Sequence, residues 1–303
     1  MTWQLRERDC PICGPNVPAN EFSAAHVDTD QLDAFAFASR KVPECMHWRL
    51  LECQKCRLLY ASPAPQLGDL ATLYRDADYD SNSEARFAAT TYRQLIARLT
   101  VNESQRGTAL DIGAGDGAFL HELLQLGYQR VVGIEPSSAP IAAAPPHVRP
   151  YLRQELFLPG LFDSDQFDLV TCFQTIEHVD DPLGLAREVL RILKPNGLMV
   201  LVGHNRNAWT AKVLGARCPI FDVEHLQLFN PTSICSLVSS AGFGDVRSGT
   251  IWNRYPLSYW MRLAPIPQFV ARPVHSLLRG CRLIDLPLSV PVGNQFVAGR
   301  REL

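Results

Sequence analysis

The sequence predicts an α/β fold, in which a parallel sheet carries a nucleotide-binding site and a small cysteine-rich module precedes it. The stretch Thr108–Phe119 (TALDIGAGDGAF) reads as an apolar strand, a glycine-rich turn and the start of a helix. That order is the first unit of a nucleotide-binding βαβ fold. In front of it lie two Cys-x-x-Cys pairs, Cys10/Cys13 and Cys53/Cys56, whose spacing is typical of a metal-bound cysteine cluster.

Composition limits the class of protein. The chain has 303 residues, 47% of them hydrophobic, which suits a large globular domain with a smaller one. The formal net charge of −2, from 29 basic and 31 acidic residues, argues against broad electrostatic binding of nucleic acid. No apolar signal segment opens the chain and no run is long enough to cross a bilayer. We therefore expect a cytoplasmic protein without transmembrane segments, whose cysteines stay reduced.

Residues 1–62 are predicted to form a zinc ribbon. Each cysteine pair offers two thiolates from one tight turn, and 39 residues separate the two pairs. Four thiolates fill the tetrahedral shell that structural Zn²⁺ prefers and leave no open position, so the metal is expected to be structural. Cys45 and His47 remain alternative ligands. The predicted ligands are Cys10, Cys13, Cys53 and Cys56.

Residues 63–103 are predicted to connect the zinc ribbon to the larger domain. Two helices are expected there, over Leu67–Tyr74 and Glu84–Leu99, the second with apolar residues at helical spacing. Tyr74 and Tyr79 are candidates for contact with substrate or cofactor; ordinary packing is the alternative for both.

The acidic residue before the first glycine of the turn distinguishes between two possible classes of nucleotide ligand. The turn has the pattern Asp111-x-Gly113-x-Gly115-x-Gly117. The Asp111 carboxylate would repel a pyrophosphate, whereas it suits an ammonium group. Asp116 opens the following helix, whose free N–H groups suit an anionic group. The next predicted strand, Arg130–Ile134, leads into Glu135, which is placed to accept two ribose hydroxyls. An ammonium group and a ribose together describe S-adenosylmethionine (SAM).

Four stretches in succession resemble the signature stretches of class I SAM-dependent methyltransferases. They read LDIGAGDG, GIEPS, FDLVTCFQTIEHVDDP and LKPNGLMVLV, within about residues 107–242. The resemblance implies a Rossmann-like, seven-stranded sheet in residues 104–303, with an antiparallel last strand between the fifth and sixth. It implies SAM as cofactor and N-terminal helices that cover it. It also implies the small-molecule branch, because Gln174–His178 stands where enzymes that methylate base amines carry Asn/Asp-Pro-Pro-Tyr/Phe.

The carboxyl ends of the predicted parallel strands define the ligand side of this domain. Phe173 and Gln174 follow the fourth strand and are expected beside the cofactor. Glu155, just beyond the third strand, is the nearest candidate for the contact with the adenine amino group that the resemblance implies; a solvated side chain is the alternative. Asp168 is expected to be structural. The remaining strands are predicted over Tyr151–Arg153, Phe167–Cys172, Leu198–Val202, Val246–Ile251 and Asn294–Gly299, and helices over Leu183–Leu193 and Pro231–Ala241.

Methyl transfer to a hydroxyl or carbon acceptor needs a base, and two histidines are candidates. His225 is the first choice, because it follows Glu224 in the segment beyond the fifth strand and a carboxylate beside an imidazole tunes it as a proton acceptor. Sugar C-methyltransferases with a similar zinc module are thought to use a histidine in such a stretch. His178, after the fourth strand, is the second candidate. Structural packing is the alternative for both.

A long insert is predicted between the last two strands, at about residues 252–292. Because the sixth strand points its carboxyl end at the ligand face, the insert is expected to wall the substrate pocket. Between Trp252 and Arg282 it has five arginines and no acid. This favours an anionic or lipid-linked acceptor, an acidic membrane surface or a contact with a second subunit, and the sequence leaves these open.

The sequence thus predicts SAM-dependent O-, N- or C-methylation of a small molecule such as a sugar, a nucleotide sugar or a specialised metabolite, with a structural zinc. One alternative is an RNA base methyltransferase that grips RNA with its zinc ribbon; the missing tetrapeptide and the acidic balance argue against it. The other is a non-catalytic binding protein, against which the intact Asp111 and Glu135 argue. The oligomeric state stays open, a dimer included.

Overall fold

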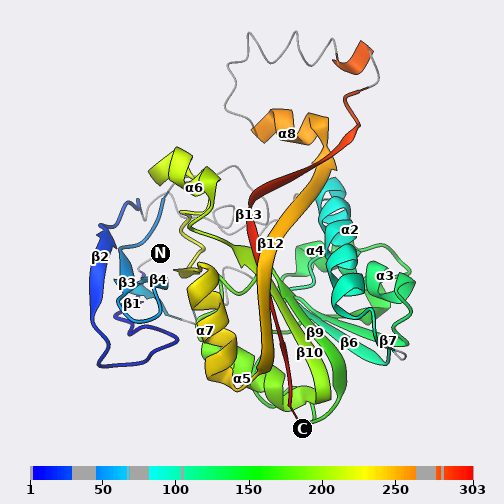
Figure 1. Ribbon diagram of the computed structural model, residues 1–303, viewed down its shortest axis with the longest axis horizontal. Helices are drawn as coiled ribbons and strands as arrows, with labels where there is room; N and C mark the ends of the chain where they lie inside the picture. The colour runs from blue at the N-terminus through cyan, green and yellow to red at the C-terminus, as the bar shows by residue number, and fades with distance from the viewer. Residues whose placement is uncertain are drawn as a thin grey trace.

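A seven-stranded mixed sheet forms the centre of the molecule (Figure 1). The computed structural model describes residues 3–28, 46–66, 68, 82–103, 106–263, 278–280 and 283–302. β13 runs antiparallel between β10 and β12, as the resemblance implied. In spatial order the strands are β12 (Gly244–Pro256), β13 (Pro287–Arg300), β10 (Leu193–His204), β9 (Phe167–Phe173), β6 (Thr108–Ile112), β7 (Arg130–Ile134) and β8 (Leu152–Arg153).

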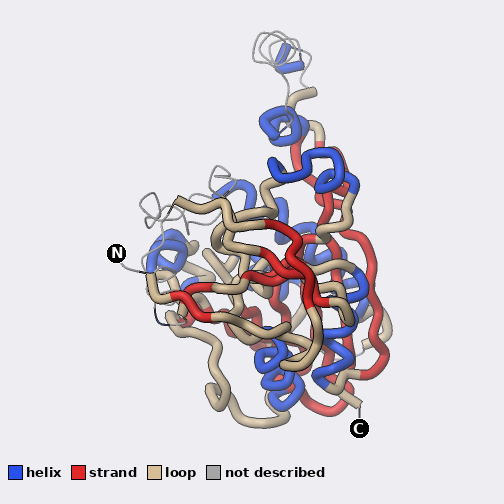
Figure 2. The backbone as a smooth tube through the Cα atoms, turned by 90° about the vertical axis from the view of Figure 1, so that its left-hand side faces the viewer, coloured by secondary structure: helices blue, strands red, loops and turns tan. Residues whose placement is uncertain are grey.

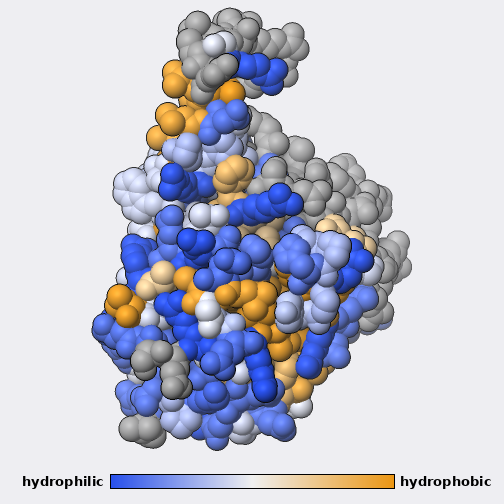
Figure 3. Space-filling model, turned by 90° about the vertical axis from the view of Figure 1, so that its right-hand side faces the viewer, coloured by the Kyte–Doolittle hydropathy of each residue, from blue (hydrophilic) through white to orange (hydrophobic). Residues whose placement is uncertain are grey.

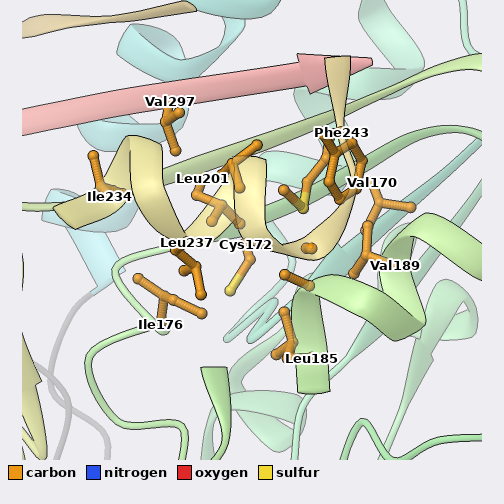
Figure 4. Packing of buried hydrophobic residues seen from close by; sticks show 14 of the residues in the cluster. Val170, Cys172, Ile176, Leu185, Val189, Leu201, Ile234, Leu237, Phe243 and Val297 are labelled. Carbon is orange, nitrogen blue, oxygen red and sulfur yellow. The ribbon is translucent and has the colours of Figure 1, made fainter. Parts of the chain in front are cut away.

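Alternating side chains bury both faces of this sheet. Met199 and Leu201 of β10 join the apolar cluster on one face, which Figure 4 shows between α5 and α7, and Leu198 and Val200 join the cluster on the other. Such alternation follows from the two-residue period of a strand. The helices are α2 (Asn82–Leu99), α3 (Ala118–Gln125), α4 (Ser138–Ala143), α5 (Pro182–Ile192), α6 (Trp209–Leu214), α7 (Pro231–Ala241) and α8 (Leu257–Leu263).

Local signals fix the ends of the elements that flank the site. The Asp181 side chain accepts a hydrogen bond from the Gly184 N–H and caps α5. Asn230 and Ser233 form a reciprocal capping box at α7, which ends at Gly242 in the left-handed region. Asp168 accepts hydrogen bonds of 2.7 Å from the Thr108 N–H and the Lys194 Nζ. These bonds tie three segments together and agree with the expected structural role of Asp168.

The cysteine-rich module shares a sheet with the larger domain. Strand β11 comes from the segment that follows β10, and it pairs with β4 through Gln227–Tyr60 and Leu228–Leu59. In Figure 1 the module lies beside α6 and α7, at the blue end of the chain. The sheet has the order β11 (Gln227–Leu228), β4 (Leu59–Ala61), β3 (Leu50–Cys53) and β2 (Ala19–Ser23), and β1 (Leu5–Arg6) pairs with β5 (Ala64–Pro65).

Strands β12 and β13 continue past the sheet as a two-stranded arm. β12 runs to Pro256, where the sequence predicted an end at Ile251, because its side chains keep alternating between buried and exposed and pair with β13 up to Pro287. The arm rises from the body and carries α8 (Figure 2). Figure 3 shows apolar residues on it. Exposed large apolar side chains on the arm include Trp252, Leu283, Leu286 and Leu288.

Several predicted features lie outside the described residues. These are most of the helix expected over Leu67–Tyr74, together with Tyr79 and Cys45. His47, the other alternative ligand, forms an isolated bridge with His26, and β3 begins at Leu50. Within the described part of the chain, no helix is both long and apolar enough to cross a membrane.

Candidate functional site

The glycine-rich turn after β6 folds back on the end of β7. The N–H groups of Gly113 and Ala114 both donate to the Ile134 carbonyl, at 2.9 and 3.0 Å. Gly113 has a φ of +76°, and a Cβ there would collide with the Thr175 side chain. Gly115 has a φ of +55° with open space where a Cβ would stand. The turn therefore presents bare backbone to a ligand on the sheet's carboxyl edge.

Asp111 is buried at the end of β6. Its Oδ1 accepts a 2.7 Å hydrogen bond from the Thr171 hydroxyl on neighbouring β9. Burial, with a smaller contribution from the charge of Glu135, raises the pKa of Asp111 to about 7, although the Thr171 bond opposes the shift. A cationic group beside Asp111 would restore its ionised form.

Glu135 lies where the sequence placed it, directly after β7. Its two carboxylate oxygens accept backbone N–H bonds of 2.9 Å from Gly115 and Ser137, which hold the side chain against the turn. Burial raises the pKa of Glu135, and the two bonds act against that shift. Asp116 is buried too and accepts a bond from the Ala118 N–H at the start of α3. The helix terminus is thus partly satisfied by its own aspartate.

Gln174 supplies the clearest sign of a ligand. It has a φ of +53°, and both the oxygen and the nitrogen of its buried side-chain amide lack a hydrogen-bond partner among the described residues. Buried polar atoms are normally paired, so this amide is suited to a polar group that a ligand brings. Together with the bare turn and the two acids, it fits the amino, carboxylate and ribose groups of SAM.

An aromatic group borders the turn. The ring of Phe173 lies 4.4 Å from that of Tyr92 on α2 and 4.9 Å from that of Phe119 on α3, measured between centroids. The helix α2 therefore reaches the end of β9, the strand that carries Phe173. Glu155 is exposed to solvent just beyond β8, so its expected contact with adenine stays a prediction.

Three histidines and a glutamate gather at the carboxyl ends of β9 and β10. The rings of His178 and His225 lie 4.9 Å apart, and the ring of His204 lies 5.3 Å from that of His225. The carboxylate of Glu224 lies 3.9 Å from the Nδ1 of His178. The structure thus brings together all three residues that the sequence offered as base or its partner.

Backbone carbonyls orient these imidazoles. The Nδ1 of His178 lies 3.1 Å from the Glu224 carbonyl, and the Nδ1 of His225 lies 2.8 Å from the Ile220 carbonyl. A carbonyl only accepts, so each Nδ1 carries the proton in the neutral ring and each Nε2 keeps its lone pair. Both histidines are therefore held in the form that accepts a proton or binds a cation through Nε2.

Two residues that the sequence did not assign complete this region. The Oε1 of buried Glu177 accepts a 2.5 Å bond from the His204 N–H, and burial raises the pKa of Glu177 to about 7. Burial, aided by the nearby His225, lowers the pKa of His204 to about 3, so its ring is uncharged. In the sequence, His204 could have been found by its place at the end of the fifth strand. No sequence pattern around Glu177 indicated that its side chain would bond to that strand.

The N-terminal module supports the segment that carries Glu224 and His225. Trp48 donates its indole N–H to the Val223 carbonyl at 2.9 Å. The buried guanidinium of Arg8 donates to the Leu226 carbonyl at 3.1 Å, and burial lowers the pKa of Arg8 to about 10. The segment that carries Glu224 and His225 is therefore held in part by residues of the N-terminal module.

The four predicted metal ligands converge within this module. One ligand atom from each lies within 4.8 Å of all the others. Each pair sits in a turn that closes on a left-handed residue, Gly14 (φ +72°) after the first and Arg57 (φ +64°) after the second. The sulfurs of Cys10 and Cys56 are 3.6 Å apart, and their hydrogen bond lowers the pKa of Cys10 and raises that of Cys56. Four soft thiol donors in this arrangement fit Zn²⁺.

The chain is similar to known methyltransferases in sequence and in structure. Residues 84–248, more than half of the chain, match the family described as "Methyltransferase domain". The ubiquinone biosynthesis O-methyltransferase of Pseudomonas fluorescens is 35% identical over 172 residues, which are 52% of this chain and 72% of that protein. The enzyme of the same name from Pseudomonas paraeruginosa is 35% identical over 36% of this chain and 50% of its own length.

The chain spans about half the length of several of these curated relatives. Among solved structures, a SAM-dependent methyltransferase of Thermotoga maritima, described as a possible histamine N-methyltransferase, aligns with a TM-score of 0.48 and 19% identity. That alignment covers 72% of this chain and 91% of the other.

Proposed function

The chain belongs to the methyltransferase-domain family of SAM-dependent methyltransferases, and we propose that it transfers the methyl group of SAM to a hydroxyl group of a small molecule. The observation that carries the proposal is the cluster of His178, Glu224 and His225 beside the glycine turn. Thr175 links the two, because its side chain packs on Gly113 while its carbonyl accepts the His178 N–H. The names of the relatives favour oxygen over nitrogen or carbon as the acceptor atom.

The residues around the turn would hold the cofactor. Asp111 would pair with the ammonium group, Glu135 would accept the ribose hydroxyls, and the unpartnered amide of Gln174 would meet a polar group of SAM. Phe173 would border the cofactor, with Gly113, Gly115 and Asp116 in the turn and Glu155 beyond β8 as the candidate for adenine. When bound, SAM supplies an electrophilic methyl group on a sulfonium sulfur. Most of the rate gain is then expected from positioning and the exclusion of water.

His225 would take the proton of the acceptor hydroxyl. Its Nδ1 is committed to the Ile220 carbonyl, so the acceptor proton can go only to Nε2. Glu224, next in sequence and close to His178, would stabilise the positive charge that forms. His178 would orient the acceptor or share the proton.

The N-terminal residues 1–62 would act as a structural zinc module, and residues 63–103 as a connection that covers the cofactor. Zn²⁺ at Cys10, Cys13, Cys53 and Cys56 would fix the turn between β1 and β2 and the turn that joins β3 to β4. A cytoplasmic location belongs to this proposal, because the four ligands need a reducing compartment. The insert at about residues 252–292 has five arginines in its sequence and exposes apolar side chains in its described part, so it would contact an acceptor that is anionic or carries a lipid chain.

Acceptor screening with methyl-labelled SAM tests the function. The full chain is incubated with phenols, catechols and sugars, and the formation of S-adenosylhomocysteine is measured with and without each acceptor. We expect acceptor-dependent turnover, and His225→Gln should lower it by roughly 100-fold or more while SAM still binds. His147→Gln, on the surface beside His121, is the matched control and should leave turnover unchanged. Equal turnover in wild type and His225→Gln would remove His225 as the base.

A further inference from the structure

We propose that His178, Glu224 and His225 bind a divalent first-row metal cation, at a site separate from the four cysteines. One ligand atom from each of the three lies within 4.8 Å of the other two. A cation that binds nitrogen and oxygen at about 2.0–2.2 Å brings its ligand atoms to about 3–4 Å from one another. A small movement of side chains therefore closes the site, without rearrangement of the sheet.

The hydrogen bonds around the imidazoles match those of metal-binding histidines. Such a histidine normally donates its other ring N–H to a carbonyl or a carboxylate, which fixes the tautomer and the direction of the lone pair. His178 and His225 both do this, towards the carbonyls of Glu224 and Ile220. Two imidazoles of fixed tautomer and a carboxylate are the donor set of sites for Zn²⁺, Fe²⁺ and related cations.

The position of the three ligands points to a cation with open coordination sites. Three protein ligands leave at least one position for water or substrate, in contrast to the closed four-cysteine site. The side chains of His178 and Glu224 are 19% and 16% exposed, so the cluster is sheltered but reachable. His178 follows β9 at the carboxyl edge of the sheet, where the acceptor is expected. The cation would therefore meet the acceptor oxygen.

The chemical consequence rests on the proposed function, whereas binding of the cation does not. A hydroxyl bound to the cation loses its proton more readily, as water does on Zn²⁺. The O–H bond breaks and the proton passes to solvent water; the oxygen then forms a bond to the methyl carbon as the carbon–sulfur bond breaks. The products are a methyl ether, neutral S-adenosylhomocysteine and one proton. In this form His225 is a ligand, and it acts as the base only in the cation-free protein.

Titration with Co²⁺ tests the site. The zinc-loaded full chain is titrated with Co²⁺, and bound cobalt per chain is measured by elemental analysis and by visible absorption. Cobalt held by imidazole and carboxylate lacks the intense thiolate charge-transfer bands that it shows at cysteines. We expect one Co²⁺ without these bands in wild type, and at least tenfold weaker binding in the near-isosteric Glu224→Gln. The double variant His121→Ala/His147→Ala removes a surface histidine pair and should bind as wild type does.

The outcomes separate this inference from the proposed function. Equal Co²⁺ binding by wild type and Glu224→Gln, or no binding beyond the cysteines, would overturn the metal site even if methyl transfer proceeds. Specific binding that is lost in Glu224→Gln supports the site even if no acceptor is methylated, and the failure then falls on the function. Turnover that added Co²⁺ raises in the wild type but not in Glu224→Gln, with zinc content and SAM affinity unchanged, supports both.

Discussion

The indole N–H of Trp48 donates a 2.9 Å hydrogen bond to the carbonyl of Val223, the residue before Glu224. Trp48 belongs to the cysteine-rich module, and Val223 to the segment that carries two residues of the histidine cluster. Both are buried in one apolar cluster, which spans the two parts of the chain. The module, which holds the four-cysteine cluster, therefore also packs against a segment of the candidate active site.

Loss of this hydrogen bond should impair turnover more than cofactor binding. Trp48→Phe keeps an aromatic ring but leaves the Val223 carbonyl without its donor, which costs about 1–3 kcal/mol for a buried group. We expect kcat to fall several-fold, while the SAM dissociation constant, measured by calorimetry, stays within about twofold. Gln54→Ala, which removes a hydrogen bond on the exposed side of the same module, is the control. A fall in SAM affinity alone would contradict the positioning role of Trp48.

Loss of a predicted zinc ligand should also disturb the segment that carries Glu224 and His225. Cys53→Ser is expected to lose zinc, to loosen the pairing of β4 with β11 and so to abolish turnover, because the segment with Glu224 and His225 loses its support. SAM binding should persist, since the glycine turn lies in the other sheet. Zinc content, SAM affinity and turnover are measured on one preparation. Cys235→Ser in α7 is the matched control, and identical zinc content in both variants would exclude Cys53 as a ligand.

Acid should weaken SAM binding through Asp111. Burial raises the pKa of this carboxyl to about 7, so below that pH the group is neutral and cannot pair with an ammonium group. We expect the affinity to be highest above about pH 8 and to fall by up to about tenfold per pH unit below about pH 6. Asp111→Asn should bind weakly at every pH. Thr171→Val removes a bond that favours the ionised form and should move the midpoint upward; a flat wild-type profile would contradict the role of Asp111.

A methyl group at Gly113 should do more harm than one at a similar backbone position elsewhere. Gly113 and Gly160 both have positive φ, at +76° and +84°, so alanine strains both by about 1–2 kcal/mol. Only at Gly113 would the Cβ also collide with Thr175. Gly113→Ala should therefore lose more unfolding free energy than Gly160→Ala in denaturant titrations, and it alone should weaken SAM binding. Equal losses in both variants would show that the close contact is unimportant.

Local patterns predicted several elements of the main sheet, and the resemblance implied the place of its antiparallel last strand. The strands at Thr108–Ile112 and Arg130–Ile134 and the helix at Pro231–Ala241 have the expected bounds, because apolar period, glycine turns and caps mark them. The predicted end of β12 at Ile251 was wrong. The residues beyond it, whose side chains still alternate between buried and exposed, were assigned to an insert. The pairing of β12 beyond Ile251 depends on residues of β13 that are more than thirty positions away in the sequence.

The sequence identified candidate site residues, but it did not predict the contacts between them. Glu135 and the pair Glu224/His225 stand out by their position after a strand or beside each other. The contact of the cysteine-rich module with Val223 and the hydrogen bond between Glu177 and His204 join segments that are distant along the chain, so no local pattern predicts them. Such contacts arise only from the packing of the two sheets.

Calorimetric titration of the full, zinc-loaded chain with SAM tests the central assignment most directly. We expect one SAM bound per chain with a micromolar dissociation constant, and at least tenfold weaker binding to Asp111→Ala. Glu155→Ala, at an exposed position, shows in the same experiment whether the adenine contact extends that far. Failure of the folded, zinc-loaded wild type to bind SAM would contradict the account and leave a zinc-ribbon protein with a methyltransferase fold but no cofactor.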